Sequence, residues 1–320
     1  MRAHHVKMPE TCGMAEDARG QRSCISTIVA MSTSPSPHPE STESRSPDLE
    51  AYFSRIGYAG RREATLDALR QIQFCHATTI PFENLSVLLG HGIDLEPAAI
   101  ERKLISERRG GYCFEQNTLL MHVLERMGFE VVPLSGRVRW MQPREFTPPR
   151  THLFLRVMIG GVAWLADVGV GGPTPTAPLR MDTSEPQETP HGMHRIVRED
   201  GRWFHQIQLA GEDAAAPVWS DVYEFTGESM PLIDRTVANW WTSTNPLSKF
   251  SLSLLAARAC SDGTRVGIFN RTFTHRRGGT LLHTHEIETP EELLEVLARE
   301  FGLRFPAGTR FGSAGKPWPT

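Results

Sequence analysis

The sequence has few cysteines, little net charge and no long apolar run. Its five cysteines are widely spaced and form no Cys-x-x-Cys pair, which argues against a disulfide scaffold and a cysteine zinc site. With 34 basic and 37 acidic side chains, the net charge is −3, so the chain has no general attraction for nucleic acid or an anionic membrane. No segment approaches the roughly 18 consecutive apolar residues of a membrane-spanning helix. These absences predict a cytoplasmic protein without nucleic-acid or membrane partners.

The composition otherwise fits a folded chain. Of the 320 residues, 39% are hydrophobic and 22% are charged, which is enough for two or three modest domains. Residues 31–48 are the exception: they hold eight Ser/Thr, four Pro and no aromatic residue, and they predict a disordered tail over 1–48. The apolar run at 24–31 is interrupted by two hydroxyl residues, so we expect no signal peptide. A start at Met14 or Met31 would leave the folded part unchanged.

Hydrophobic periodicity divides the rest of the chain into three units. Helical spacing runs through residues 49–130 and includes a helix expected at 113–127. Alternating strand patterns follow over 131–230 and predict an antiparallel sheet or small barrel. A linker helix at 231–245 leads into residues 246–320, where strands precede a final helix with a capping box. The pattern therefore predicts an α+β fold.

The sequence RRGGYCFE at 108–115 is the strongest local signal. Its two glycines permit a sharp turn, and Cys113 then begins a helix whose unpaired N–H groups favour an anion such as a thiolate. The alternative is a buried, unreactive cysteine, which is favoured for Cys75 and Cys260 because each lies within an apolar run. For Cys113 the motif alone leaves both interpretations open.

A predicted hairpin supplies a partner for this thiol. Strands are expected at 151–159 and 162–168, joined by two glycines. Pairing across this two-residue turn makes His152 a diagonal neighbour of Asp167 on one face. A carboxylate on an otherwise apolar strand needs a compensating partner such as an imidazole. A purely structural His–Asp pair is the alternative, and it is preferred if Cys113 takes no part.

Other histidines and glycines carry weaker signals. His283 and His285 alternate on one strand, and His191 and His194 lie in a polar segment, but neither pair has a third metal ligand nearby. The glycine-rich segment 169–172 lacks the Lys-Ser/Thr of a phosphate loop. We therefore predict no metal site and no Walker or Rossmann chemistry.

Several motifs, in the same order, resemble the arylamine N-acetyltransferases over residues 49–310. They are PFENL at 81–85, RGGYCFEQN at 109–117, His152-Leu153, Asp167-Val168-Gly169, and TSTNP at 242–246 with Ser248 and Phe250. His152 follows Cys113 by 39 residues and Asp167 follows His152 by 15, which fits the family's Cys-His-Asp triad. The resemblance implies an α+β fold with an N-terminal helical bundle, an antiparallel β-barrel and a C-terminal α/β lid around a cysteine-protease-like triad core.

The resemblance also implies an activity. It is the N-acetylation of arylamines and arylhydrazines in xenobiotic metabolism, with acetyl-CoA as co-substrate, no metal, and an acetyl-Cys113 thioester intermediate in a ping-pong reaction. His152, oriented by Asp167, would move protons. The implied acceptor-binding residues are Phe82, Phe114 and Val170. The implied coenzyme A contacts are Gly171, Thr242, Ser243, Thr244 and Ser248.

Two positions depart from the family pattern. Val170 stands where the family often has Phe, which predicts a wider acceptor pocket, and Asn245 stands where His is common before Pro246. For Phe82 and Phe114, ordinary core packing is the alternative to substrate contact.

Three other functions remain open at this stage. A cysteine hydrolase would use the same three side chains to transfer acyl groups to water, and an amide synthase of the same superfamily would form macrolactams. A non-catalytic binding module is disfavoured because all three residues are present. The sequence leaves open the physiological amine, the preferred acyl group and the oligomeric state.

Overall fold

The structure, a computed structural model, describes residues 47–210 and 216–312. The tail predicted over 1–48 lies outside the described residues except for Pro47 and Asp48. Asp48 is the N-cap of the first helix, and its Oδ1 accepts a hydrogen bond from Glu50 N at 2.9 Å. The domain boundaries expected from the sequence stay predictions.

The N-terminal region is helical and is built around one central helix. Its elements are α1 (Leu49–Ile56), α2 (Leu66–Thr79), the short strand β1 (Phe82–Glu83), α3 (Leu85–Leu88), α4 (Pro97–Glu101), a π-helical turn (Arg102–Ser106) and α5 (Cys113–Arg126). Helix α5 is buried on nearly all sides, which is why its sequence is apolar around much of its circumference. Gly128, two residues beyond its end, has φ of 87°, as expected for a residue that follows a helix C-cap.

Eight antiparallel strands form the second region. They are β2 (Glu130–Val138), β3 (His152–Ile159), β4 (Val162–Ala166), β5 (Leu179–Arg180), β6 (Gln187–Thr189), β7 (Gly192–Glu199), β8 (Arg202–Leu209) and β9 (Val218–Ser229). Their order in the sheet is β5-β4-β3-β2-β9-β8-β7-β6. The sheet curls until its two edge strands meet through one side chain: Gln187 accepts from Arg180 N at 2.7 Å and donates to Arg180 O at 3.0 Å. The result is a nearly closed barrel.

The C-terminal region combines a second sheet with three helices. After α6 (Leu232–Thr244) and α7 (Lys249–Leu252) come β10 (Leu255–Ala259), β11 (Thr264–Phe269), β12 (Thr272–Arg277), β13 (Thr280–Glu286) and α8 (Pro290–Phe301). Strand β1 from the helical region pairs with β10, with Phe82 opposite Ala257. The five-stranded sheet is therefore assembled from two distant parts of the chain.

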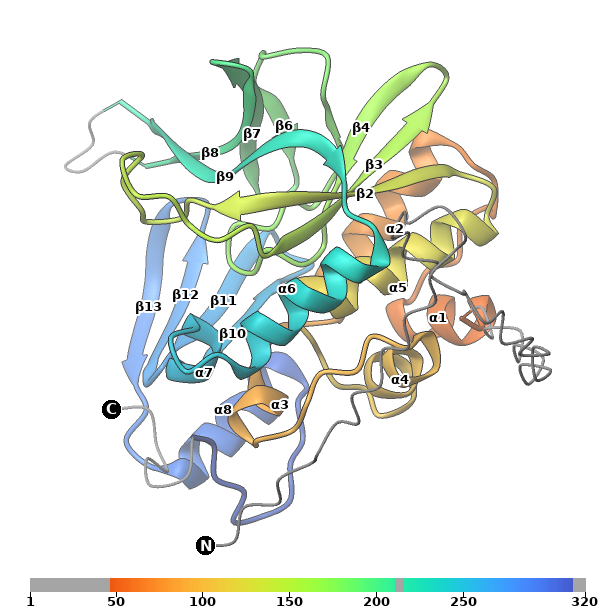
Figure 1. Cartoon of the computed structure of the whole chain (residues 1–320). Coiled ribbons are helices and arrows are strands. Elements are labelled where there is room, and N and C mark those ends of the chain that lie inside the picture. Colours follow the sequence, from red (N-terminus) through yellow and green to blue (C-terminus); the bar gives the residue numbers. More distant parts are fainter. Residues whose placement is uncertain (1–46, 211–215, 313–320) are drawn as a thin grey trace, which may run out of the picture. The chain divides into compact units, whose positions relative to one another are not determined.

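Helix α6 connects the barrel to the C-terminal region. In Figure 1 the barrel strands lie above α6, and α3, α7 and α8 lie below it. The architecture confirms the predicted α+β class with a helical region, a barrel and an α/β region. Within the described residues, no helix combines the length and apolar character required to span a bilayer.

Candidate active site

Cys113 is the first residue of α5 and follows a turn that requires glycine. A Cβ on Gly110 would lie 2.2 Å from a backbone carbonyl oxygen, and a Cβ on Gly111 would lie 2.6 Å from Glu115 Oε2. The Glu115 carboxylate accepts a hydrogen bond from Tyr112 N at 3.1 Å, which caps the start of α5. The Cys113 side chain thus begins a helix inside the protein, with only 4% of the residue exposed.

The hairpin of β3 and β4 has the register expected from its two-residue turn. Ile159 is opposite Val162, and the ladder ends one residue before Asp167. His152 Nε2 and Asp167 Oδ2 are 2.7 Å apart, and both side chains are buried. The hairpin alone therefore brings an imidazole and a carboxylate into hydrogen-bond contact.

Helix α5 packs against this pair and delivers the thiol to it. Cys113 Sγ donates to the carbonyl oxygen of Thr151, at 3.6 Å, in the residue next to His152. A Cβ on Gly169 would lie 2.7 Å from Cys113 Cα, so a glycine permits the segment after Asp167 to approach α5 this closely. Because Asp167 occupies Nε2 of His152, Nδ1 is the ring nitrogen left for the thiol.

The charges in this site favour a protonated His152. Burial disfavours the imidazolium, but the charge and hydrogen bond of Asp167, aided by the Cys113 thiol, outweigh it and raise the pKa of His152 to about 10. Burial also opposes ionisation of Asp167. There the His152 charge and three hydrogen bonds, from His152, Gly169 N and Asn117, prevail and lower the pKa of Asp167. The site therefore holds a carboxylate and an imidazolium beside the thiol.

Comparisons with known proteins identify the group to which this arrangement belongs. A family model described as N-acetyltransferase matches residues 65–309. The arylamine N-acetyltransferase of Mycobacterium tuberculosis (strain ATCC 25618 / H37Rv) is 41% identical over 262 residues, which cover 80% of this chain and 89% of that protein. The chain belongs to the arylamine N-acetyltransferase family. The Escherichia coli (strain K12) member is 38% identical over 257 residues, with 80% and 89% covered.

Solved structures of arylamine N-acetyltransferases have the same fold. The enzyme from Salmonella typhimurium superposes with a TM-score of 0.75 at 36% identity, covering 83% of this chain and 94% of that one. The Mycobacterium marinum enzyme in complex with CoA superposes with a TM-score of 0.74, also at 36% identity, over 80% of this chain and 92% of its own. This chain is accordingly an acyltransferase of that family.

Asn117 was not assigned a role from the sequence, although it lies four residues after Cys113 on the same face of α5. Its Nδ2 donates to Asp167 Oδ1 at 2.9 Å and to Leu153 O at 2.8 Å, and its Oδ1 accepts from Val168 N at 3.1 Å. The amide thus ties α5 to β3 and to the segment that follows β4. The spacing of four residues from Cys113 was the signal that could have revealed it.

Tyr223 of β9 completes the surroundings of His152. The two ring centroids are 4.7 Å apart, and the tyrosine is fully buried. Burial, followed by the nearby Asp167 charge, raises the pKa of Tyr223 well above its usual value. No local pattern could have revealed this contact, because Tyr223 lies 71 residues from His152 in the sequence.

The residues predicted to bind the acceptor lie at different depths. Phe82 and Phe114 share an apolar cluster with Cys113, and Phe114 is completely buried within it. Val170 is half-buried and packs against the barrel core instead. Gly171 has its Cα against the ring of Phe82, where a Cβ would lie 3.4 Å from the ring. Their roles in binding stay predictions.

The hydroxyl groups predicted to contact coenzyme A have partners within the protein. Thr242 donates to Ala238 O at 2.7 Å, Ser243 to Asn239 O at 2.8 Å, Thr244 to Trp240 O at 2.5 Å, and Ser248 to Thr242 O at 2.6 Å. Thr242 and Ser248 are buried, whereas Ser243 is half-buried and Thr244 is exposed. Of these four, Ser243 and Thr244 are the more accessible to a ligand. The coenzyme A contacts likewise stay predictions.

A cavity of about 430 Å³ has Thr151, whose carbonyl oxygen contacts the Cys113 thiol, among its walls, although Cys113 itself does not line it. Its walls come from the segment before β3, the end of β9 and α6, and include Thr151, Met230 and Ala238. Thr151 O accepts from the thiol, and the other two residues share the apolar cluster of Cys113.

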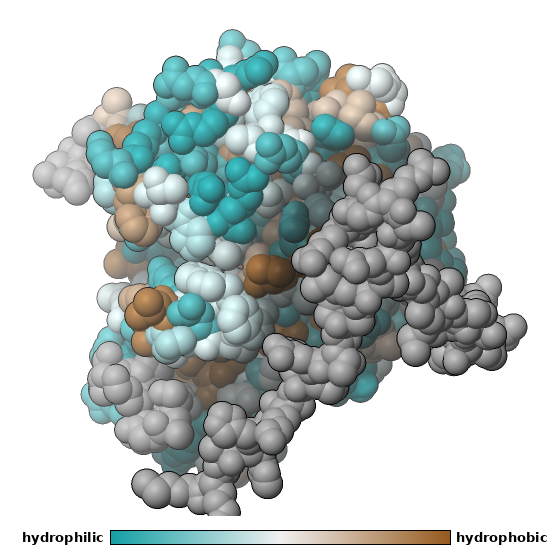
Figure 2. All heavy atoms as spheres, viewed as in Figure 1, coloured by the Kyte–Doolittle hydropathy of each residue, from teal (hydrophilic) through white to brown (hydrophobic). Residues whose placement is uncertain are grey.

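Figure 2 shows mostly hydrophilic surface over the barrel strands and hydrophobic areas over α6 and α7. The cavity is therefore bounded by a polar barrel on one side and a more apolar helix on the other.

Of the four other histidines singled out from the sequence, three have polar partners within the protein, and His283 stacks on the ring of His285 with centroids 6.4 Å apart. His191 is 2.9 Å from Thr176 Oγ1 and 2.8 Å from Cys260 O, and His194 contacts a second buried imidazole. His285 is 2.5 Å from Glu292 Oε1. Among the residues that the structure describes, no three His, Cys, Asp or Glu side chains are grouped as a metal site would require.

Proposed function

We propose that this enzyme transfers the acetyl group of acetyl-CoA to arylamines and arylhydrazines through an acetyl-Cys113 intermediate. The observation that carries the proposal is the position of the Cys113 thiol at the start of a helix, beside a buried His152–Asp167 pair. Family membership and the relative solved with CoA support the choice of donor. Acetyl-CoA is then a co-substrate of the reaction.

In the first half-reaction, Cys113 gives its thiol proton to His152, and the resulting thiolate attacks the thioester carbonyl carbon of acetyl-CoA. The tetrahedral intermediate expels the coenzyme A sulfur, which takes the proton from the His152 imidazolium. The N–H groups of Cys113 and Phe114 precede the first hydrogen bond within α5, which Glu115 N makes to Tyr112 O, so we assign these two to the stabilisation of the oxyanion. One thioester replaces another, and the products are acetyl-Cys113, free coenzyme A and a neutral His152.

In the second half-reaction, the amine nitrogen attacks the acetyl carbon. Neutral His152 accepts the proton that the amine loses, and Cys113 leaves as a thiolate, which restores the starting charges. Asp167 stabilises the imidazolium formed in this step. We assign Phe82, Phe114 and Val170 to acceptor binding. We assign Gly171 and the hydroxyl groups of Thr242, Ser243, Thr244 and Ser248 to coenzyme A binding.

For the compartment we propose the cytoplasm. Cys75, Cys113 and Cys260 are all free thiols in the described part of the chain, and free thiols suit a reducing environment. We propose small-molecule partners only, with neither nucleic acid nor membrane among them.

The test is the intact mass of the protein after incubation with acetyl-CoA. We expect one added acetyl group, located on Cys113 by peptide mapping and released when aniline is added, with formation of acetanilide. Cys113→Ser should gain none, while Cys75→Ser and Cys260→Ser should behave as the unmodified protein. Release at the same rate without an amine would identify a hydrolase instead, and absence of any acetyl-enzyme would refute the ping-pong mechanism.

A further inference from the structure

A cluster of arginines on the barrel holds the loop between β2 and β3. At its centre is Glu224 of β9, whose side chain is buried. Arg139 Nη2 lies 2.9 Å and Arg202 Nη1 3.1 Å from Glu224 Oε2, and Arg137 Nε is 4.0 Å from Oε1. Three guanidinium groups share this carboxylate, and Arg139 is itself only 3% exposed. A buried charge of this kind is costly to leave unpaired, so the pair of Arg139 and Glu224 has a fixed position.

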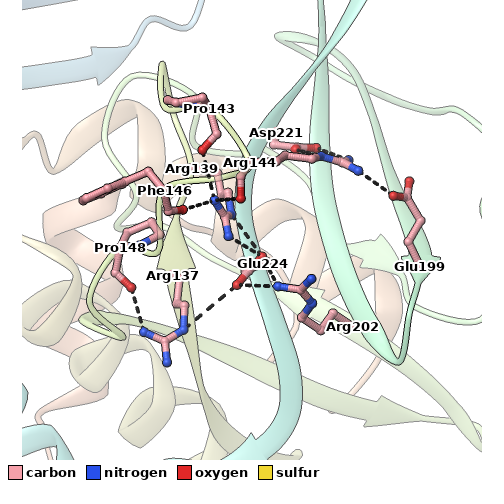
Figure 3. Close-up of polar contacts among 10 residues, drawn as sticks. All are labelled: Arg137, Arg139, Pro143, Arg144, Phe146, Pro148, Glu199, Arg202, Asp221 and Glu224. Atoms are coloured by element: carbon pink, nitrogen blue, oxygen red, sulfur yellow. Dashed lines mark hydrogen bonds and ion pairs between the residues drawn. The ribbon is translucent and has the colours of Figure 1, made fainter.

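The other side of the Arg139 guanidinium is directed at the loop. Its Nη1 donates to the carbonyl oxygens of Pro143 at 3.2 Å, Arg144 at 3.1 Å and Phe146. Figure 3 shows Arg139 between Glu224 and these carbonyl groups. The planar guanidinium fork can donate in both directions at once, which a lysine ammonium cannot reproduce.

Apolar packing does little to hold this loop. Met141 is 78% exposed and Phe146 is 51% exposed. Arg137 Nη1 donates to Pro148 O at 2.6 Å, and the Arg144 side chain reaches Asp221 of β9 at 2.7 Å. Apart from the buried Pro148, the loop is therefore fixed mainly by arginine hydrogen bonds and not by burial of its own side chains.

The end of this loop reaches the candidate active site. Pro149, Arg150 and Thr151 line the 430 Å³ cavity, and the Thr151 carbonyl oxygen accepts from the Cys113 thiol. Only two residues separate Pro148, which is held by Arg137, from Thr151. Movement of this end of the loop would displace both the cavity wall and a direct contact of Cys113.

We propose that Arg139 is a positioning residue which, from Glu224, holds the loop of residues 141–150 in place, and with it the cavity wall of Pro149, Arg150 and Thr151 next to the Cys113 thiol. The proposal rests on the function proposed for Cys113, but access to the thiol can be measured without turnover. Arg139 acts through the loop and through Thr151, and it contacts no reacting atom.

The experiment compares Arg139→Lys with Arg202→Lys. Both variants keep a positive charge beside Glu224, but Arg202 donates to Glu224 without contacting the loop, so it is the matched control. The rate of iodoacetamide alkylation at Cys113 is measured by peptide mass spectrometry, with Cys75 and Cys260 in the same sample as reporters of general unfolding. Arg139→Lys removes hydrogen bonds from a charged guanidinium to the loop carbonyl oxygens. We therefore expect the rate of Cys113 alkylation to rise about tenfold in this variant. Arg202→Lys should leave it unchanged.

Kinetics supply a second readout. With the cavity wall released, the KM for acetyl-CoA or the amine should rise in Arg139→Lys while kcat at saturation changes little, because the three side chains Cys113, His152 and Asp167 are intact. Arg137→Lys releases the loop at Pro148 alone and should produce a smaller change in the same direction, which keeps the test valid if Arg139→Lys folds poorly.

The proposal is refuted if Cys113 reactivity stays constant in both loop variants. Equal effects in Arg202→Lys, or a proportional rise at Cys75 and Cys260, would show a general role in barrel stability instead. Failure of acetyl-CoA to acetylate Cys113 would count only against the proposed function.

Discussion

At the scale of single residues, Asp167 is held from several directions. It contacts His152 through Oδ2 at 2.7 Å, and its Oδ1 accepts from Asn117 Nδ2 and Gly169 N. These hydrogen bonds fix the carboxylate in a buried position where ionisation alone would be unfavourable. The orientation of the His152 ring follows from that of the carboxylate, so the pair behaves as one unit.

Replacing Asp167 by Asn should lower the pH range in which the site functions. In the unmodified protein burial disfavours the His152 imidazolium, but Asp167 outweighs this effect and raises the pKa of His152 to about 10. In Asp167→Asn the imidazolium loses its carboxylate partner, so this pKa should fall. We expect the unmodified enzyme to keep its rate of acetyl-enzyme formation through neutral pH and to lose it as the pH passes about 10. In Asp167→Asn the decline should come at a lower pH. Single-turnover measurements across pH check this, and an identical profile in both proteins would show that Asp167 does not set the charge of His152.

Val170→Phe should narrow the acceptor pocket. Changes of this size in an apolar pocket alter discrimination by roughly 10- to 200-fold. The ratio of kcat/KM for a bulky arylamine to that for aniline should fall by about tenfold, the lower end of this range, because Val170 is half-buried and faces the barrel core. Acetylation of Cys113 should be almost unaffected. If both amines are slowed equally, or the acetylation step is slowed, Val170 lies outside the acceptor pocket.

At the scale of elements, local patterns predicted what local structure determines. The start of α5 at Cys113 and the register of the β3–β4 hairpin both follow from short segments with glycine turns. The sequence could not predict the contact of Tyr223 with His152 or the closure of the barrel by Gln187. Those contacts join residues far apart in the chain, and their side chains carry no periodic signal of their own.

The barrel interior also contains a histidine pair whose neutrality should limit acid stability. His205 Nε2 and His194 Nδ1 are 2.9 Å apart, and both residues are fully buried. Burial lowers the pKa of His205 to about 3 and that of His194 well below its usual value. Between about pH 3 and 6.5 the unfolded chain therefore binds a proton at His205 that the folded protein does not, so the free energy of unfolding decreases as the pH falls.

This linkage predicts the behaviour of His205→Gln. Each such histidine contributes a slope of about 1.4 kcal/mol per pH unit to the free energy of unfolding in that window. The variant is less stable than the unmodified protein near neutral pH, because it loses a buried ring, but its stability should fall less steeply towards acid. Urea unfolding at several pH values measures the slope, and equal slopes in the two proteins would contradict a neutral His205.

At the scale of the whole molecule, the described chain begins with two residues that hold α1 in place. The carbonyl oxygen of Pro47 accepts from Arg126 Nη1 at 2.6 Å, and Asp48 caps α1 and donates through its backbone N–H to Glu101 at 3.2 Å. These contacts join the start of α1 to the end of α5 and to α4. The sequence just before Pro47 is rich in Ser, Thr and Pro and lacks aromatic residues that could start a core.

Two deletions should distinguish the contribution of the tail to stability from that of Pro47 and Asp48. Removal of residues 1–45 should leave both transfer activity and the melting temperature nearly unchanged. Removal of residues 1–48 also deletes the N-cap and should destabilise the protein by roughly 0.5–2 kcal/mol. Thermal unfolding of the two truncated proteins makes the comparison, and a large loss of stability in the shorter deletion would show that the tail contributes to the fold.

The pairing of β1 with β10 has a consequence for how the protein is made. Phe82 shares an apolar cluster with Cys113. Its partner in the ladder, Ala257, lies in the last quarter of the chain. During synthesis the helical region and the barrel emerge from the ribosome first, while the strand beside the cysteine still lacks its neighbour. Such distant pairings form slowly, so a nascent chain carries a complete set of Cys113, His152 and Asp167 long before the wall around them is finished. We therefore expect transfer activity to appear only after β10 has been synthesised and has paired with β1.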